Sequence, residues 1–358
     1  GTLVALTLTL PPADVCPAGQ AEEILAAAKT ATGGAAWDGL RSLHTKGKLA
    51  LGGMSGTYES WDDVRSGRTL DRFALGPMSG AQGFDGTTLW SQDSSGQVRL
   101  EQGGEERAAA ANDSYRRSLA YWYPDRRSAT FELLGRQEEG GRAFNVLRIT
   151  PTGGRPYDLW VAATTHLFDR TIEKAALETR KVFFSDYRQV AGVLLPFAIR
   201  STNGDERYDQ LGVVESIQAG APVDDALFAA PAPPPPDWSF AEGATSTKVP
   251  FNLLNNHIYL KVTLNGAGPF TLLCDTGGVN IVTPELAARL GLASEGRLEG
   301  RGVGEKSEDV GLSKVGTLQL GDAILHDQVF MVFPLGALSD VEGIPVSGLV
   351  GYEIFKRF

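Results

Sequence analysis

The chain has 358 residues, 42% of them hydrophobic, and carries a net charge of −10 from 33 basic and 43 acidic side chains. This length predicts about two domains, and the 43 glycines and 19 prolines favour a β-rich chain with many turns. The acidic excess argues against a binder of bulk nucleic acid. Because Cys16 and Cys274 are the only cysteines and the four histidines are isolated in sequence, we expect neither a disulfide framework nor a metal site.

An uncharged apolar run opens the chain at residues 2–10 and is followed by Pro11, Pro12 and Ala13. It is much shorter than the about 20 residues that span a bilayer. The run fits either the tail of a secretory signal peptide or a strand in which Thr and Leu alternate, and the Pro-Pro-Ala that follows favours export. We therefore interpret residues 1–19 as a signal-peptide remnant or an N-terminal strand, and we expect a periplasmic or exported protein of the bacterial cell envelope.

The clearest boundary in the chain is the proline run at residues 231–236, PAPPPP. Consecutive prolines cannot donate to a β-ladder and favour an extended spacer. The prediction is a first domain at residues 20–230, a Pro-rich linker at 231–247 and a second domain at 248–358.

The first domain is expected to begin with a helix at residues 21–31, which ends at Gly33-Gly34. A second helical stretch is expected at 105–122, with Leu119, Trp122 and Tyr123 on its apolar face. Alternating segments separated by turn residues predict a long antiparallel meander. Its expected strands are residues 44–51, 56–64, 87–92, 144–150, 157–162, 168–174, 181–187, 194–201 and 210–218.

Several of these segments resemble bacterial lipoprotein-sorting (LolA-like) domains. They are AAAKTATGGAAWDGLRSLHTKGKLAL, YDLWVAATTHLFDRTIEK and FFSDYRQVAGVLLPFAIR, the last followed by VDDALFAAP. The resemblance implies a strongly curved antiparallel half-barrel sheet whose hollow is covered by helices. In carrier members of the family the hollow binds acyl chains, so a lipid or lipopeptide is one expected partner. The alternative is a filled core that recognises a partner or positions the second domain.

The second domain contains the stretch with the most chemical information, an apolar strand at residues 270–274 that runs into Asp275-Thr276-Gly277. A carboxylate at the end of an apolar strand is partly desolvated. Thr276 adds a hydroxyl, and the glycines Gly277 and Gly278 permit a tight turn whose N–H groups approach the carboxylate. Such a carboxylate can accept and return a proton. The neighbouring Cys274 is interpreted as a small apolar filler rather than a redox switch.

Residues 248–358 resemble the first half of a retropepsin-like bacterial aspartyl protease, in which strand, Asp-Thr-Gly loop and helix follow in this order. The resemblance implies that Asp275, Thr276 and Gly277 are catalytic. It places Gly302, Val303 and Gly304 in a flap that binds substrate together with Gly278. The second hallmark of the family, two apolar residues followed by Gly, is matched by Gly348-Leu349-Val350-Gly351, which is expected to pack under the loop.

The sequence departs from the family pattern at two points. Gly278 stands where pepsin-like enzymes have Ser or Thr, so it offers no side chain to hydrogen-bond Asp275. Aspartic protease chemistry also needs two aspartates that share a proton, and we find one Asp-Thr-Gly. The second aspartate is expected from a two-fold-related copy or from a further lobe beyond residue 358, and this chain alone is expected to be inactive. His257, beside the first strand of this domain, is expected to have a capping or loop role rather than a catalytic one.

The sequence therefore predicts a mainly β, α+β protein: a curved antiparallel half-barrel with covering helices, followed by a retropepsin-like, β-rich acid-protease half-domain. The expected function is aspartic endopeptidase, with a peptide as substrate and no cofactor or metal. The alternative is a periplasmic lipid- or lipopeptide-binding protein whose protease-like half is inactive. An inactive homodimer formed through the protease-like half is a third possibility.

Overall fold

The computed structural model describes residues 19–175, 179–301 and 307–358. The apolar run at residues 2–10, Cys16, and the predicted flap residues Gly302, Val303 and Gly304 lie outside these described residues.

The first domain is built on a thirteen-stranded antiparallel sheet in the order β6-β5-β4-β3-β2-β1-β13-β12-β11-β10-β9-β8-β7. Neighbours in this order are neighbours in sequence except where β1 pairs with β13, for example Leu49 with Gly212. The predicted meander is therefore confirmed, and its two ends meet in the middle of the sheet. The strands are β1 (Ser42–Leu51), β2 (Met54–Asp63), β3 (Arg68–Leu75), β4 (Met78–Phe84), β5 (Leu89–Gln92), β6 (Val98–Glu101), β7 (Ala129–Glu139), β8 (Arg142–Pro151), β9 (Tyr157–Ala162), β10 (Phe168–Lys174), β11 (Thr179–Val190), β12 (Val193–Thr202) and β13 (Gln210–Ala219).

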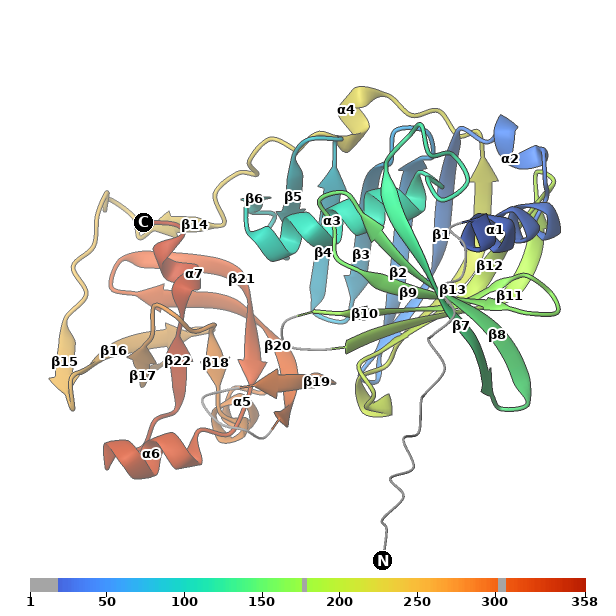
Figure 1. The fold of residues 1–358 in the computed structure, drawn as a ribbon. Helices are drawn as coiled ribbons and strands as arrows, with labels where there is room; N and C mark the ends of the chain where they lie inside the picture. Colours follow the sequence, from blue (N-terminus) through green and yellow to red (C-terminus); the bar gives the residue numbers. More distant parts are fainter. Residues whose placement is uncertain (1–18, 176–178, 302–306) are drawn as a thin grey trace, which may run out of the picture.

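Two longer helices, α1 (Gly19–Ala31) and α3 (Gly104–Arg117), lie on the same side of this sheet (Figure 1). Register shifts at Lys46/Gly47, Leu133/Gly135 and Phe168/Arg170 interrupt the ladders, and such bulges bend a sheet. The shorter helical elements are α2 (Ala36–Gly39), η1 (Glu206–Tyr208) and α4 (Asp225–Phe228). The sheet is thus curved around the side that the two longer helices cover.

The second predicted helix is shorter than expected. It ends at Arg117 because Leu119 adopts a positive φ of 55°, which breaks the helical path. The turn carries Tyr121 and Trp122 toward the hydrophobic cluster that contains Leu25 of α1 and Leu159 of β9. The apolar residues in this stretch therefore form a turn against the core rather than a helix face.

The second domain is a nine-stranded sheet. Eight strands follow the order β14-β21-β18-β22-β17-β16-β20-β19, and β15 pairs with β16 alone. The fold class predicted for both domains is confirmed. The elements are β14 (Trp238–Phe240), β15 (Phe251–Leu254), β16 (His257–Leu264), β17 (Ala267–Cys274), β18 (Ile281–Val282), α5 (Pro284–Arg289), β19 (Glu295–Arg301), β20 (Ser307–Leu320), β21 (Ala323–Val332), α6 (Gly336–Glu342), β22 (Gly348–Val350) and α7 (Tyr352–Phe355).

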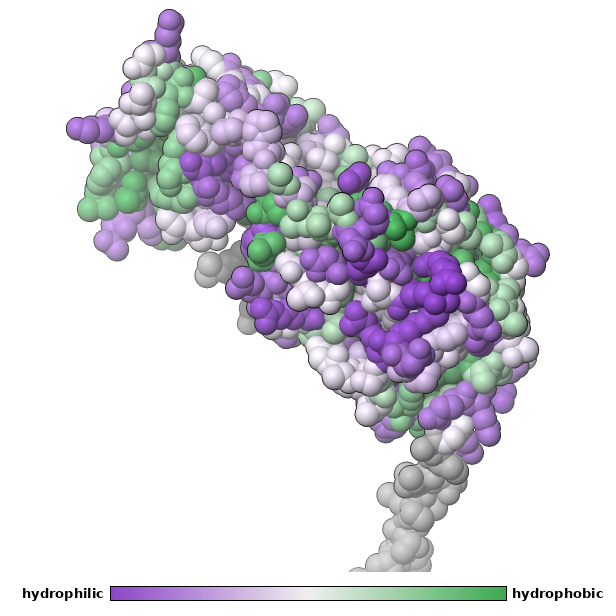
Figure 2. Space-filling view, turned by 90° about the horizontal axis from the view of Figure 1, so that it is seen from above, coloured by the Kyte–Doolittle hydropathy of each residue, from purple (hydrophilic) through white to green (hydrophobic). Residues whose placement is uncertain are grey.

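The two domains form two lobes when the molecule is seen from above (Figure 2). Apolar surface is visible at the outer end of the smaller lobe, the end where Figure 1 places β15. All four residues of β15 are exposed, and Phe251 and Leu253 expose 57% and 65% of their surface. This strand therefore presents apolar side chains to solvent.

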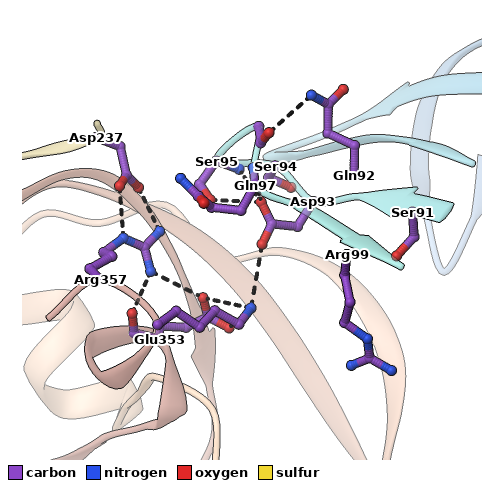
Figure 3. A network of polar contacts seen from close by, with 12 residues as sticks. Ser91, Gln92, Asp93, Ser94, Ser95, Gln97, Arg99, Asp237, Glu353 and Arg357 are labelled. Atoms are coloured by element: carbon purple, nitrogen blue, oxygen red, sulfur yellow. Dashed lines mark hydrogen bonds and ion pairs between the residues drawn. The ribbon is translucent and has the colours of Figure 1, made fainter. Parts of the chain in front are cut away.

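The stretch after the proline run is anchored to the second domain. Strand β14 pairs with β21, and Asp237, which precedes it, accepts hydrogen bonds from Nε and a terminal nitrogen of Arg357 at 2.7 and 2.5 Å (Figure 3). The Arg357 side chain is 1% exposed and also reaches Glu353. Next to it, Lys356 Nζ lies 3.4 Å from Asp93 of the first domain. This charged network ties the start of the second domain to residues 353–357.

We expect Asp237→Asn to lower the free energy of unfolding at pH 7 by about 1.5–3 kcal/mol, because it removes the charged partner of a buried guanidinium. Burial alone would raise the pKa of Asp237, but the hydrogen bonds from Arg357 and Gln328 hold it below its ordinary value of 3.8. The difference in unfolding free energy between variant and wild type should therefore be at its maximum above pH 3.8 and shrink as the pH falls below this value.

Urea denaturation at pH 7 and at low pH measures this difference. The exposed Asp322→Asn is the matched control and should change stability by less than about 0.5 kcal/mol. Equal losses in the two variants would contradict the proposed anchor.

Candidate active site

The Asp-Thr-Gly sequence forms the turn that follows β17. The backbone N–H of Asp275 donates to the carbonyl of Val350 at 3.0 Å. Asp275 and Gly278 are half-buried, whereas Thr276 and Gly277 are exposed. The predicted catalytic and loop residues thus occupy one turn at the end of an apolar strand, with the carboxylate held at the domain surface.

The two oxygens of the Asp275 carboxylate have different surroundings. Oδ1 accepts a hydrogen bond from the N–H of Gly277 at 2.9 Å, so the turn itself orients the carboxylate. A Cβ at Gly278 would lie 2.9 Å from Oδ2, closer than real Cβ contacts. Glycine at this position therefore leaves Oδ2 uncovered. Within the described residues, the Asp275 side chain makes no ion pair. There its one hydrogen bond is the one that it accepts from the N–H of Gly277.

Cys274, immediately before the aspartate, is a half-buried free thiol. Burial and the neighbouring charge of Asp275 raise the pKa of this thiol. A raised pKa keeps the sulfur protonated and unreactive near neutral pH, which agrees with its interpretation as a small apolar filler.

Strand β22, which holds Gly348, Leu349 and Val350, is inserted between β17 and β18. It pairs in parallel with β17, where Cys274 faces Val350, and antiparallel with β18. A Cβ at Gly351 would lie 2.4 Å from the carbonyl oxygen of Gly278. The Gly-Leu-Val-Gly segment and the Asp-Thr-Gly loop are thus in direct backbone contact.

Asn280 is a residue of this site that sequence reasoning missed. Its side chain is 1% exposed and its Oδ1 accepts the N–H of Gly351 at 2.9 Å, while its carbonyl accepts the N–H of Met331 at 2.9 Å. Its Nδ2 is buried and has no hydrogen-bond partner among the residues that the structure describes. An Asn two residues after the Gly-Gly pair is the one sequence signal that could have drawn attention to it.

His257 belongs to a separate polar cluster around Glu342. Its Nδ1 lies 2.8 Å from Glu342 Oε1, and the hydroxyl of Tyr259 donates to Oε2 at 2.7 Å. The Tyr259 hydrogen bond holds the pKa of Glu342 below its ordinary value. His257 therefore pairs with a carboxylate of α6 and makes no hydrogen bond with Asp275 among the described residues.

The first domain has a cavity of about 690 Å³, open to solvent, between its sheet and the α3 region, and this volume is typical of small-molecule sites. Two arginines of α3 reach its wall, but Arg116 pairs with Asp113 and Glu173, and Arg117 pairs with Asp62 and Asp71. Much of the remaining wall is apolar and includes Trp37, Leu159, Phe168, Phe184, Ile199 and Ile217.

Strands β19 and β20 flank the predicted flap residues. They pair antiparallel up to Arg301 and Ser307, and Gly302, Val303 and Gly304 between them lie outside the described residues. In the parts of the chain that the structure covers, no helix has the length and apolar character needed to cross a membrane. Over the same residues, no group of three His, Cys, Asp or Glu side chains could hold a metal ion.

The model of the aspartyl protease family matches residues 260–354, which include both glycine-containing segments described above. The LolA superfamily protein from Nitrosomonas europaea is 13% identical over 58% of this chain and 97% of its own, with a TM-score of 0.42. A lipoprotein-sorting protein domain from Vibrio parahaemolyticus is 12% identical over 59% and 97%, with a TM-score of 0.41. A retropepsin-like aspartic protease from Rickettsia conorii is 17% identical over 32% and 83%, with a TM-score of 0.24.

No curated protein matches the chain. Both resemblances recognised in the sequence are found again in these comparisons. The likeness of the second domain to aspartyl proteases is carried by the family match over residues 260–354.

We expect Gly351→Ala to displace the Asp-Thr-Gly loop, because the added methyl group would overlap the backbone of Gly278 and Val279. Such overpacking costs about 1–3 kcal/mol of unfolding free energy. Gly336→Ala is the matched control, since a Cβ there meets nothing within 4 Å. Urea denaturation of both variants checks this, and a Gly351→Ala chain as stable as the control would show that the contact is dispensable.

Proposed function

We propose that this protein is an aspartic endopeptidase in which Asp275 is one of two catalytic aspartates. The observation that carries the proposal is the half-buried Asp275 carboxylate, held by the Gly277 N–H and by the backbone bond to Val350. The match of residues 260–354 to the aspartyl protease family supports it. Thr276, Gly277 and Gly278 would complete the loop, and Gly302, Val303 and Gly304 would contact substrate.

The chemistry needs a second aspartate about 3 Å away. One carboxylate, ionised, takes a proton from a bridging water while the other, protonated, donates to the scissile carbonyl oxygen. The two carboxylates then titrate as a pair. With one Asp-Thr-Gly in 358 residues, this mechanism requires the second aspartate to come from a partner copy or from a further lobe, and the chain alone to be inactive.

The apolar surface beside the loop supports the proposal that the site lacks a second protease-like half. Exposed Leu253 faces Ile258 across the β15–β16 pair, and Ile258 faces Cys274 across the β16–β17 pair. Leu253 and Ile258 are 65% and 37% exposed. A second protease-like half that approached Asp275 would cover this row and remove it from water.

We expect Asp275→Asn, in the protein that carries both aspartates, to lower peptide cleavage by about 10²–10⁴-fold, because it removes a group that transfers a proton. The measurement is kcat/KM on a fluorogenic peptide library between pH 3 and pH 7, where the wild type should lose activity on both sides of an optimum.

The control for this experiment is Cys274→Ala, which alters the neighbouring side chain and should leave the pH profile in place. Normal cleavage by Asp275→Asn, or a wild-type activity with no acid limb, would exclude the proposed mechanism.

The cavity of the first domain favours a second candidate function, the binding of a lipid or lipopeptide in the cell envelope, with a protease-like half that serves as a scaffold. Its volume and apolar wall suit an acyl chain. In either case we propose a periplasmic or exported protein.

A dansyl-labelled undecanoic acid should bind the cavity and gain fluorescence. Ile217→Glu should weaken this binding at least about tenfold, because it places a carboxylate in the apolar wall. Leu211→Glu, on the same strand but 44% exposed and outside the wall, is the control and should bind normally. Equal affinities of these two variants would exclude the cavity as the binding site.

A further inference from the structure

Two side chains belong both to the wall of the cavity and to the contact between the domains. Leu49 on β1 and Tyr58 on β2 line the cavity, and both also pack in a hydrophobic cluster that spans the domains. The members of this interdomain cluster from the second domain are Leu298, Leu312, Val329 and Met331. An occupant of the cavity would therefore touch residues that support the protease-like domain.

The contact between the domains is close at the backbone. The N–H of Arg297 on β19 donates to the carbonyl of Gly52 at 2.7 Å. A Cβ at Gly52 would lie 2.0 Å from the carbonyl oxygen of Arg297, and a Cβ at Gly296 would lie 2.6 Å from Cε of Met54. Two glycines thus let the turn between β1 and β2 pack directly on β19, so a shift of this turn must move its neighbour.

Polar bonds hold the rim of the same contact. Asn203 donates to Glu299 at 2.8 Å, and the hydroxyl of Tyr208 donates to Asp309 at 2.9 Å. Asp309 also pairs with Arg297 at 3.1 Å. The rim bonds end on β19 and β20, two of the three strands whose side chains enter the interdomain cluster.

From the interdomain cluster, a series of three contacts leads to the Asp-Thr-Gly loop. Met331 on β21 faces Leu312 on β20, and its N–H donates to the carbonyl of Asn280 at 2.9 Å. The side chain of Asn280 in turn accepts the N–H of Gly351 at 2.9 Å, and Gly351 packs on the carbonyl of Gly278. The cavity wall and the Asp-Thr-Gly loop are therefore joined by one continuous series of packed and hydrogen-bonded groups.

We propose that occupancy of the first-domain cavity is coupled to the Asp-Thr-Gly loop, so that a bound apolar chain regulates the protease-like domain. The coupling runs through Leu49 and Tyr58 in the first domain and through Leu312 and Met331 in the second. The inference rests on the binding of an apolar chain proposed above. Packed cores respond to added volume as units, and a chain that fills the space beside Leu49 and Tyr58 presses them onto Leu312 and Met331. Among the described residues, the hydroxyl of Tyr58 is buried without a hydrogen-bond partner.

The test measures backbone hydrogen exchange of the loop, residues 275–282, with and without saturating dansyl-labelled undecanoic acid. In the wild type the bound probe should slow exchange in this segment about fivefold, the lower range of typical coupling between sites. Leu312→Ala should bind the probe but lose this effect, because the cluster no longer transmits the contact. Leu312→Met should retain it, since methionine conserves the side-chain volume.

Leu318→Ala is the matched control. It removes the same side chain from the same strand, but Leu318 is buried in the core of the second domain and not in the interdomain cluster. This variant should keep the slowing.

An unchanged exchange rate in wild type saturated with probe, or an effect retained in Leu312→Ala, overturns the coupling and leaves both proposed functions standing. A wild type that binds no probe overturns the carrier function together with the coupling.

Discussion

The arrangement of the candidate site depends on the insertion of β22 between β17 and β18. This strand gives the loop its backbone bond from Asp275 to Val350 and its packing against Gly351. A Cβ at Gly348 would lie 2.3 Å from the carbonyl oxygen of Ile281, and a Cβ at Gly351 would lie 2.4 Å from that of Gly278. Only glycine therefore lets these segments approach so closely. The orientation of the carboxylate is therefore fixed by residues near the end of the chain as much as by its own turn.

Direct contacts also join the two domains. A chain with a run of prolines between domains is expected to separate them by a stiff spacer, yet β14 joins the second sheet directly after that run, and Asp237 pairs with the buried Arg357. The turn after β1 then packs on β19. Leu49 and Tyr58 line the cavity and also pack in the cluster that spans the domains, so the two domains contact each other directly.

Much of the first sheet was predictable because its strands alternate and end at turn residues; β9 and β10 begin and end at the expected residues, 157–162 and 168–174. Strand β4, MSGAQGF, was missed because two glycines and short side chains leave little hydrophobic alternation. The helix expected at 105–122 stops at Arg117, since burying Tyr121 and Trp122 stabilises the turn more than continued helix would. For this helix, tertiary packing overrode a local pattern.

Within the site, the sequence by itself determined the position of Asp275 at the end of an apolar strand, the glycine turn after it and the second glycine-bounded segment, because these follow from local residue order. Tertiary structure alone decided that Asn280 bonds Gly351, that Gly278 leaves Oδ2 of Asp275 uncovered, and that Leu49 and Tyr58 serve both cavity and interface. The Asn280–Gly351 bond and the packing of Leu49 and Tyr58 against the second domain join residues far apart in the chain. Their pairing depends on how two curved sheets pack in three dimensions, which no local periodicity encodes.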